Sequence, residues 1–226
     1  RLPCVSGKDS MKNDYGKGPD KISIPPTLLF SLFGDHPDVR NSATSDLKHP
    51  GDKLYLVGES LEELGASELA FMMTENGQAA GIGGNVPLLT DPERLFSSYR
   101  ALSKAINSGV VKTAHDCSEG GVGVALAEMC IGGRIGAKID IDGTGNTTAW
   151  ARLWGESLGR IIIAVSPQNN TKFLELMTGH TTTLLGEVEA TNQLIIVDGF
   201  DELVSIEVTD LVTSWQGTLD LTGGVA

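Results

Sequence analysis

The stretch that most constrains the fold is Ala114–Met129, AHDCSEGGVGVALAEM, because its character changes twice within a few residues. Val110 and Val111 lead into a polar corner, and the pair Gly120 and Gly121 then opens a run of apolar residues. These recur at helical spacing: Val122, Ala125, Leu126, Met129. The pattern predicts a strand, a glycine turn and a helix in succession.

Such a turn has two interpretations. A helix that begins at a glycine turn presents free backbone N–H groups and the positive end of its dipole, where an anion can sit. Glycine also lets a ligand approach the backbone closely. Alternatively, the turn needs only a positive φ, and Ser118 or Glu119 caps the helix. The residues alone leave both interpretations open.

Composition limits the class of protein. With 226 residues the chain is long enough to bury a core, as one large α/β domain or as a domain with an appendage. Hydrophobic residues make up 40% and charged residues 20%, as in ordinary soluble proteins. The net charge of -12, without a basic run, argues against nucleic-acid or anionic-membrane binding. A phosphorylated ligand would therefore need a few placed donors or a metal.

Compartment follows from what the chain lacks. No stretch has the ~18 apolar residues of a membrane span, and no signal peptide is visible. The three cysteines, Cys4, Cys117 and Cys130, are odd in number and lack C-x-x-C spacing, so they indicate neither a disulfide frame nor a zinc site. We expect a cytoplasmic protein.

The N-terminal segment is dense in functional side chains. The chain starts at Arg1 and reaches VSGKDSM within a few residues, so we expect a piece of a longer protein, although a proteolysed terminus would look the same. Lys8 offers a point charge, Asp9 a hard oxygen ligand for magnesium and Ser10 a hydroxyl for phosphate. The glycine and the Ser or Thr of the common phosphate loop are missing. An exposed terminal turn is the structural alternative.

Patterning along the chain predicts the elements. Strands are expected at 27–32, 53–57, 137–141, 160–165, 181–185, 193–197 and 203–208, and helices at 58–73, 91–108, 167–177 and 209–215 in addition to the central one. The mixed order of strands and helices favours a layered α/β (α+β) domain, in which a mixed β-sheet packs against helices, over a strict βαβ alternation.

Two further polar corners follow or precede strands. Asp140 and Asp142 end a predicted strand and could hold a metal, although aspartates there more often serve turns. Glu156 and Ser157 precede the apolar strand 160–165, where a site could lie; a helix end with solvated side chains is the alternative.

Four motifs occur in an order that resembles a known family. VSGKDSM, GASE at Gly65–Glu68, AHDCSEGGVGVALAEM and WGESLGRIIIAV resemble the C-terminal half of the phosphoribosylformylglycinamidine synthase family. More broadly, they are similar to the ATP-using superfamily of aminoimidazole ribonucleotide (AIR) synthetase, selenophosphate synthetase and thiamin-monophosphate kinase. The resemblance extends from Pro3 to about Leu219, and the GKDSM segment is what points to this synthase.

The resemblance implies a domain division and a reaction. Residues 1–34 would be an entering strand with the GKDS segment, at the end of a preceding ferredoxin-like domain, and residues 35–226 an AIR synthase-like C-terminal α/β domain. The family uses ATP and Mg²⁺ to phosphorylate the amide oxygen of formylglycinamide ribonucleotide. Ammonia released from glutamine then displaces phosphate to give the amidine, with positioning and magnesium supplying much of the catalysis. The implied partners are the remaining synthetase domains and a glutaminase domain or subunit.

The resemblance also implies site residues. By this resemblance, Asp9 matches a metal ligand of the family. The family has two ATP-binding-type halves, and Glu156 and Ser157 match a corner that touches substrate in the other half. The family's catalytic histidine and glutaminase nucleophile have no counterpart here, so the catalytic residues stay unknown. The positions that match substrate- or nucleotide-binding motifs are Gly7, Lys8, Asp9, Ser10, Ser118, Gly120, Gly121, Glu156 and Ser157.

Because the first half of the synthase is absent, we expect no synthase activity from this chain alone. Two alternatives stay open. The chain is a non-catalytic half that holds nucleotide structurally, or it belongs to another superfamily enzyme of the selenophosphate synthetase or thiamin-monophosphate kinase type. A selenophosphate synthetase would show a reactive cysteine near its start; Cys4 stands in roughly that place, but GKDSM follows it.

Overall fold

The computed structural model describes residues 6–7, 14–23, 28–36, 38–75 and 84–217. The chain divides into two compact units, Arg1–Pro37 and Asp38–Ala226. In the first unit, strands β1 (Asp14–Tyr15) and β2 (Ile22–Ser23) pair antiparallel around the short 3-10 helix η1 (Gly18–Asp20).

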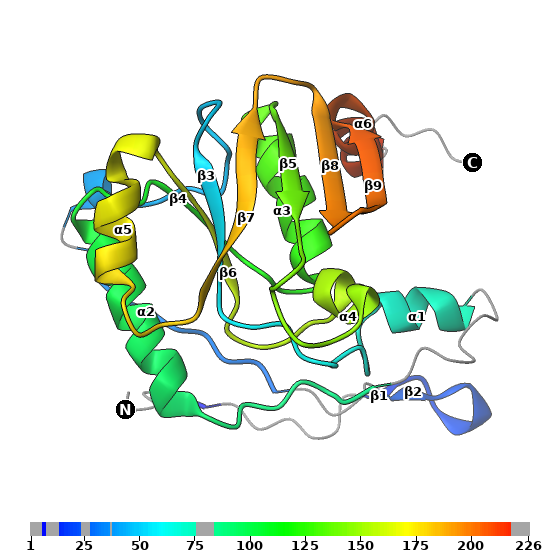
Figure 1. The fold of residues 1–226 in the computed structure, drawn as a ribbon. Helices are drawn as coiled ribbons and strands as arrows, with labels where there is room; N and C mark the ends of the chain where they lie inside the picture. The colour runs from blue at the N-terminus through cyan, green and yellow to red at the C-terminus, as the bar shows by residue number, and fades with distance from the viewer. Residues whose placement is uncertain (1–5, 8–13, 24–27, 37, 76–83, 218–226) are drawn as a thin grey trace. The chain divides into compact units, whose positions relative to one another are not determined.

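A seven-stranded sheet forms the centre of the second unit (Figure 1). Its spatial order is β4-β6-β3-β7-β5-β8-β9, and of the pairs described only β5 with β8 is parallel. The mixed sheet predicted from the order of elements is therefore confirmed. Its strands are β3 (Lys53–Val57), β4 (Thr113–Asp116), β5 (Gly136–Asp140), β6 (Ile161–Val165), β7 (Thr182–Glu189), β8 (Gln193–Asp198) and β9 (Asp201–Glu207).

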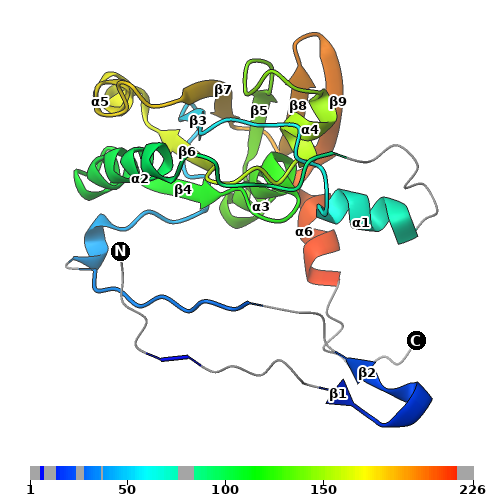
Figure 2. The ribbon, with the colours of Figure 1, turned by 90° about the horizontal axis from the view of Figure 1, so that it is seen from below.

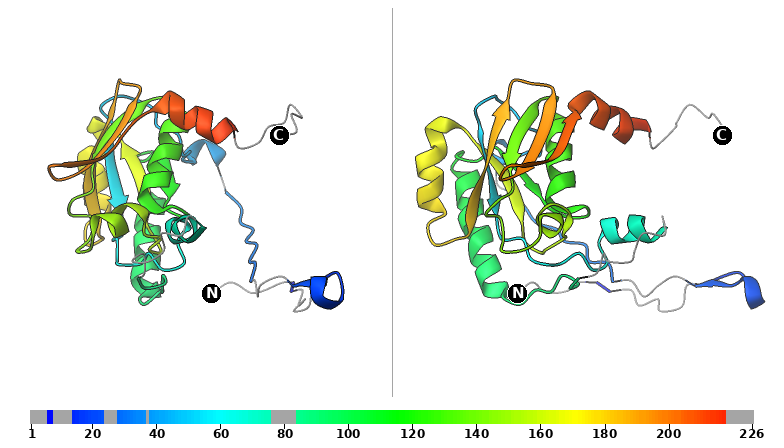
Figure 3. Two further views of the ribbon diagram at one scale, coloured as in Figure 1. Left: turned by 90° about the vertical axis from the view of Figure 1, so that its right-hand side faces the viewer. Right: turned by 45° about the vertical axis from the view of Figure 1, so that its right-hand side comes forward.

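Helices cover both faces of this sheet, and α3 and α5 lie on opposite sides of it in both views of Figure 3. Seen from below in Figure 2, α3 and α6 lie on the same side. The bounds are α1 (Glu68–Glu75), α2 (Pro92–Asn107), α3 (Gly121–Gly133), α4 (Ala149–Trp154), α5 (Asn170–Leu176) and α6 (Val208–Gly217), with 3-10 turns η2 (Val39–Asn41) and η3 (Pro167–Asn169).

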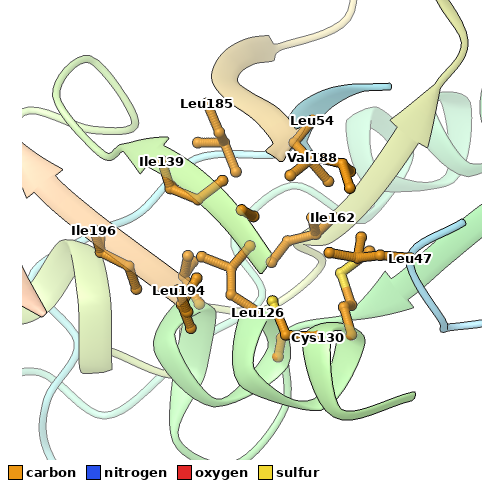
Figure 4. Packing of buried hydrophobic residues seen from close by; sticks show 14 of the residues in the cluster. Leu47, Leu54, Leu126, Cys130, Ile139, Ile162, Leu185, Val188, Leu194 and Ile196 are labelled. Carbon is orange, nitrogen blue, oxygen red and sulfur yellow. The ribbon is translucent and has the colours of Figure 1, made fainter. Parts of the chain in front are cut away.

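Alternation along the central strands builds a core on each face. In β3, Leu54 and Leu56 belong to the cluster that α3 covers, whereas Tyr55 and Val57 belong to the cluster under α2 and α5. Because strand side chains alternate between faces, one short strand contributes to both cores. Figure 4 shows the larger cluster, in which Leu126 and Cys130 of α3 point toward the sheet.

Two predicted elements differ from the structure. The strand expected at 27–32 is wrong over its described part: residues 28–33 form no strand, and Leu28, Leu29 and Phe30 are exposed. Apolar, β-prone residues form a strand only where another strand pairs with them, and none of the described strands pairs with this segment.

The helix expected at 58–73 begins only at Glu68. Upstream, two amides donate to distant partners: Ser60 N–H to the Thr144 carbonyl (2.9 Å) and Leu61 N–H to the Ser157 hydroxyl (3.0 Å). Ser67 then starts α1, since its hydroxyl accepts the Ala70 N–H at 3.2 Å. Tertiary contacts thus override the helical pattern.

The remaining predicted elements are confirmed to within a few residues. Asp91 caps α2, accepting the Arg94 N–H at 3.0 Å, and Pro92 opens the helix. The β6 strand is buried on both faces. Over the part of the chain that the structure describes, no helix is long and apolar enough to cross a bilayer.

Candidate functional site

The corner between β4 and α3 has the predicted geometry of strand, glycine turn and helix. Gly120 and Gly121 have φ values of 75° and 63°, in the left-handed region that favours glycine. A side chain would also collide: a Cβ on Gly120 would overlap Val124, and a Cβ on Gly121 would overlap the Gly155 carbonyl. The two glycines therefore let the corner pack closely against Val124 and against the backbone at Gly155.

The first amide of the corner already has an anionic partner. Gly120 N–H donates to Oε1 of Glu156 at 2.9 Å, and Glu68 N–H donates to the same oxygen at 2.8 Å. The structure thus brings together two residues, Gly120 and Glu156, that the sequence placed in separate corners. In this structure the anion at the corner is the chain's own Glu156 carboxylate.

The alternative in which a side chain from the turn caps α3 is wrong. Gly120 is the N-cap, and α3 has no side-chain cap. The Ser118 hydroxyl donates instead to Oδ2 of Asp116, at 2.5 Å, and this bond lowers the pKa of the Asp116 carboxyl. Ser118 therefore orders the turn from its outer side.

Ser157 faces inward. It is buried, and its hydroxyl accepts the Leu61 N–H at 3.0 Å. Its carbonyl accepts Nε–H of Arg160, also at 3.0 Å. The described contacts make Ser157 a link between the segment before α1 and the segment before β6.

Arg160 is the main residue of this region that sequence reasoning missed. Its guanidinium is buried, and it donates to the Ser60 hydroxyl (2.9 Å), the Ser157 carbonyl and the Gly155 carbonyl. Burial lowers its pKa. The available signal was a charged residue directly before an uninterrupted apolar strand, which predicts either a solvated strand end or a buried cation with several acceptors.

The outer rim of the corner is polar and more accessible. His115 Nε2 contacts Glu128 Oε2 at 2.8 Å, and its Nδ1 lies 3.4 Å from Asp116 Oδ1. Burial, with the Asp116 charge as the smaller cause, raises the pKa of Tyr99. Cys117 is buried, and burial raises the pKa of its thiol to about 12, so it is a packed thiol.

A pocket of about 130 Å³ is lined by residues that precede α1, by the start of α2 and by Leu158 and Gly159. Its polar lining combines the acids Glu59, Glu63 and Asp91 with one base, Arg94. Arg94 Nη2 donates to the Thr181 hydroxyl at 2.5 Å, and Glu63 Oε1 accepts the Leu88 N–H at 3.3 Å. Mixed charge of this kind identifies no single ligand class.

The N-terminal site residues are placed only in part. Lys8, Asp9 and Ser10 lie outside the described residues, and Gly7, in the first unit, is exposed. Over the described ranges, no three His, Cys, Asp or Glu side chains gather as a metal site. The Asp140 carboxylate instead accepts the N–H groups of Asp142 (2.9 Å) and Gly199 (3.0 Å), which is the turn role expected for it.

Comparison with known proteins places the chain. Residues 49–199 match the family model of the AIR synthase related protein, C-terminal domain. The phosphoribosylformylglycinamidine synthase subunit PurL of Deinococcus radiodurans is 35% identical over 225 residues, which is 96% of this chain and 29% of that protein. The Limosilactobacillus reuteri subunit is 34% identical over 214 residues, which is 95% of this chain and 27% of that protein. The chain therefore spans less than a third of these relatives.

Solved structures agree on the fold. Thermotoga maritima PurL complexed with FGAR superposes with a TM-score of 0.63 at 19% identity, over 77% of this chain and 30% of that one. The hydrogenase maturation protein HypE in complex with ATP superposes with a TM-score of 0.51 at 14% identity, over 75% of this chain and 55% of that one. With a family model that matches residues 49–199, the chain belongs to the AIR synthase related proteins and carries their C-terminal domain.

Proposed function

We propose that this chain is the C-terminal part of the synthetase region of a phosphoribosylformylglycinamidine synthase, a cytoplasmic enzyme of purine biosynthesis. The observation that carries the proposal is similarity to two PurL subunits over at least 95% of the chain. Because the chain spans less than a third of each relative, it would contribute to the activity of a larger protein.

The proposed reaction is ATP-dependent formation of a C–N bond. Phosphorylation of the amide oxygen of formylglycinamide ribonucleotide creates a good leaving group, and ammonia from glutamine displaces it. Structures of Thermotoga maritima PurL with FGAR, which is formylglycinamide ribonucleotide, with ATP and with ADP support this choice of substrate and nucleotide. A complex named PurLQS from the same organism supports further protein partners. We propose that one of them is a glutaminase subunit or domain that supplies the ammonia.

Within that reaction we assign the GKDS segment to ligand contact. Lys8 and Ser10 would meet phosphate, with Gly7 allowing close approach, and Asp9 would bind Mg²⁺, which neutralises nucleotide phosphates when bound. The donor types suit such a site, whereas the described residues offer no metal cluster. The division into an entering segment, 1–34, and a C-terminal domain, 35–226, belongs to the same proposal.

The polar corner around Glu156 would act as a scaffold in this scheme. Polar atoms of this corner form hydrogen bonds within the chain, at Gly120, Glu156 and Ser157. Ser118 does the same through Asp116. A second candidate function, a half of the synthase that holds nucleotide structurally without turning it over, is compatible with this structural role of the corner.

The experiment that tests the proposal compares two proteins in one assay. The longer natural protein or complex that contains residues 1–226 is supplied with formylglycinamide ribonucleotide, MgATP and either glutamine or ammonia, and amidine formation is followed alongside phosphate release. We expect product from the longer protein and none from residues 1–226 alone.

Three results would separate the alternatives. Phosphate release with no dependence on formylglycinamide ribonucleotide would contradict the synthase assignment and favour another superfamily enzyme. Turnover by residues 1–226 alone would contradict the expectation that the missing half is required. Nucleotide that stays bound to the chain without turnover would support the structural half.

A further inference from the structure

One carboxylate oxygen joins two helix starts that are far apart in sequence. Oε1 of Glu156 accepts N–H groups from Gly120, 36 residues away, and from Glu68, 88 residues away. Gly120 is the N-cap of α3, and Glu68 is the first residue of α1. The first amides of a helix carry partial positive charge, so a carboxylate is favourable at both positions.

The neighbours of Glu156 fix where this carboxylate stands. Its own N–H donates to the Glu63 carbonyl at 3.2 Å, on the segment that leads to α1. The next residue, Ser157, accepts the Leu61 N–H with its hydroxyl and the Arg160 Nε–H with its carbonyl. On the other side, Cys117 N–H donates to the Arg160 carbonyl at 3.0 Å. The segment 156–160 is thus bonded both to the approach to α1 and to the approach to α3.

We propose that Glu156 is a positioning residue that holds the start of α1 against the glycine corner before α3, and that its carboxylate is the internal anion of that corner. A single acceptor with two donors makes the two helix starts move together. The role does not depend on which ligand the protein binds, so it stands or falls separately from the proposed function.

The test uses backbone amide resonances of the chain, with Glu156→Ala and Glu156→Gln as variants. Alanine removes the acceptor, whereas glutamine keeps an acceptor oxygen without the charge, and uncharged bonds are about half as strong. Asp140→Asn is the matched control, because Oδ1 of Asp140 also accepts two amides, those of Asp142 and Gly199, in another part of the fold.

We expect Glu156→Ala to move the Gly120 and Glu68 amide resonances upfield together and to speed hydrogen exchange at Gly120 by about tenfold or more. Glu156→Gln should move both resonances in the same direction by a smaller amount. Asp140→Asn should move only its own pair. If Glu156→Ala fails to fold, the comparison of Glu156→Gln with Asp140→Asn decides the question.

Two results would overturn the proposal. A response of one amide without the other would show that the helix starts are not joined through this oxygen. Equal effects of Glu156→Gln and Glu156→Ala would show that a retained acceptor oxygen does not hold the two amides.

Discussion

Replacement of Gly121 by alanine tests the geometry of the β4–α3 corner. Two costs add at this position. The left-handed φ of 63° costs an alanine about 1–2 kcal/mol. The new Cβ would also stand 3.0 Å from the Leu153 carbonyl and closer still to that of Gly155, and overpacking against backbone typically costs about 1–3 kcal/mol. We therefore expect Gly121→Ala to lose about 2–5 kcal/mol of unfolding free energy.

Gly143→Ala is the matched control. Gly143 has a comparable φ of 78°, but nothing lies within 4 Å of a Cβ built there. The difference between the two variants, about 1–3 kcal/mol, isolates the close approach of the corner to residues 153–155. Urea unfolding followed by tryptophan fluorescence measures it. Equal losses in the two variants would refute the packing described for the corner.

Three further predictions follow from buried and polar groups. Arg160→Met should cost about 3 kcal/mol or more in urea unfolding, because buried acceptors left without a donor cost about 1–3 kcal/mol each; a loss below 1 kcal/mol would contradict the bonds described. Burial raises the pKa of the Cys117 and Cys130 thiols to about 12. In a Cys4→Ser background, both should therefore react with a thiol reagent at pH 8 only after unfolding. Fast reaction of the folded chain would disprove their burial. The Thr147 hydroxyl lowers the pKa of the Glu62 carboxyl below 4.5. The unfolding free energy of wild type should therefore exceed that of Glu62→Gln above pH 4.5, and the difference should shrink as pH falls. A difference that does not depend on pH would contradict this.

Local chemistry predicted the elements that carry strong signals. Asp91 and Pro92 mark the start of α2 because capping and a fixed proline φ act within one turn. Gly120 and Gly121 mark the β4–α3 turn for the same reason, since only glycine adopts this backbone without strain. In these places the local preference and the fold agree.

Other features depend on partners that no local pattern specifies. Residues 58–67 have a helical pattern, but the amides of Ser60, Leu61 and Gly65 bond to Thr144, Ser157 and Asn85 instead. The shared contact of Glu156 with Gly120 and Glu68 joins three segments that only the fold brings together. The polar corner and the family resemblance both pointed to Glu156, but neither pointed to its contacts with these two amides.

The measurement that tests the central assignment most directly is a calorimetric titration of formylglycinamide ribonucleotide into the longer protein that contains residues 1–226. The titration is made in parallel on Asp9→Ala and on Asp20→Ala, an exposed aspartate nearby in sequence. We predict binding in the presence of MgATP that Asp9→Ala abolishes and Asp20→Ala retains. Binding that is the same in Asp9→Ala and wild type, or no binding by the folded protein, would contradict it.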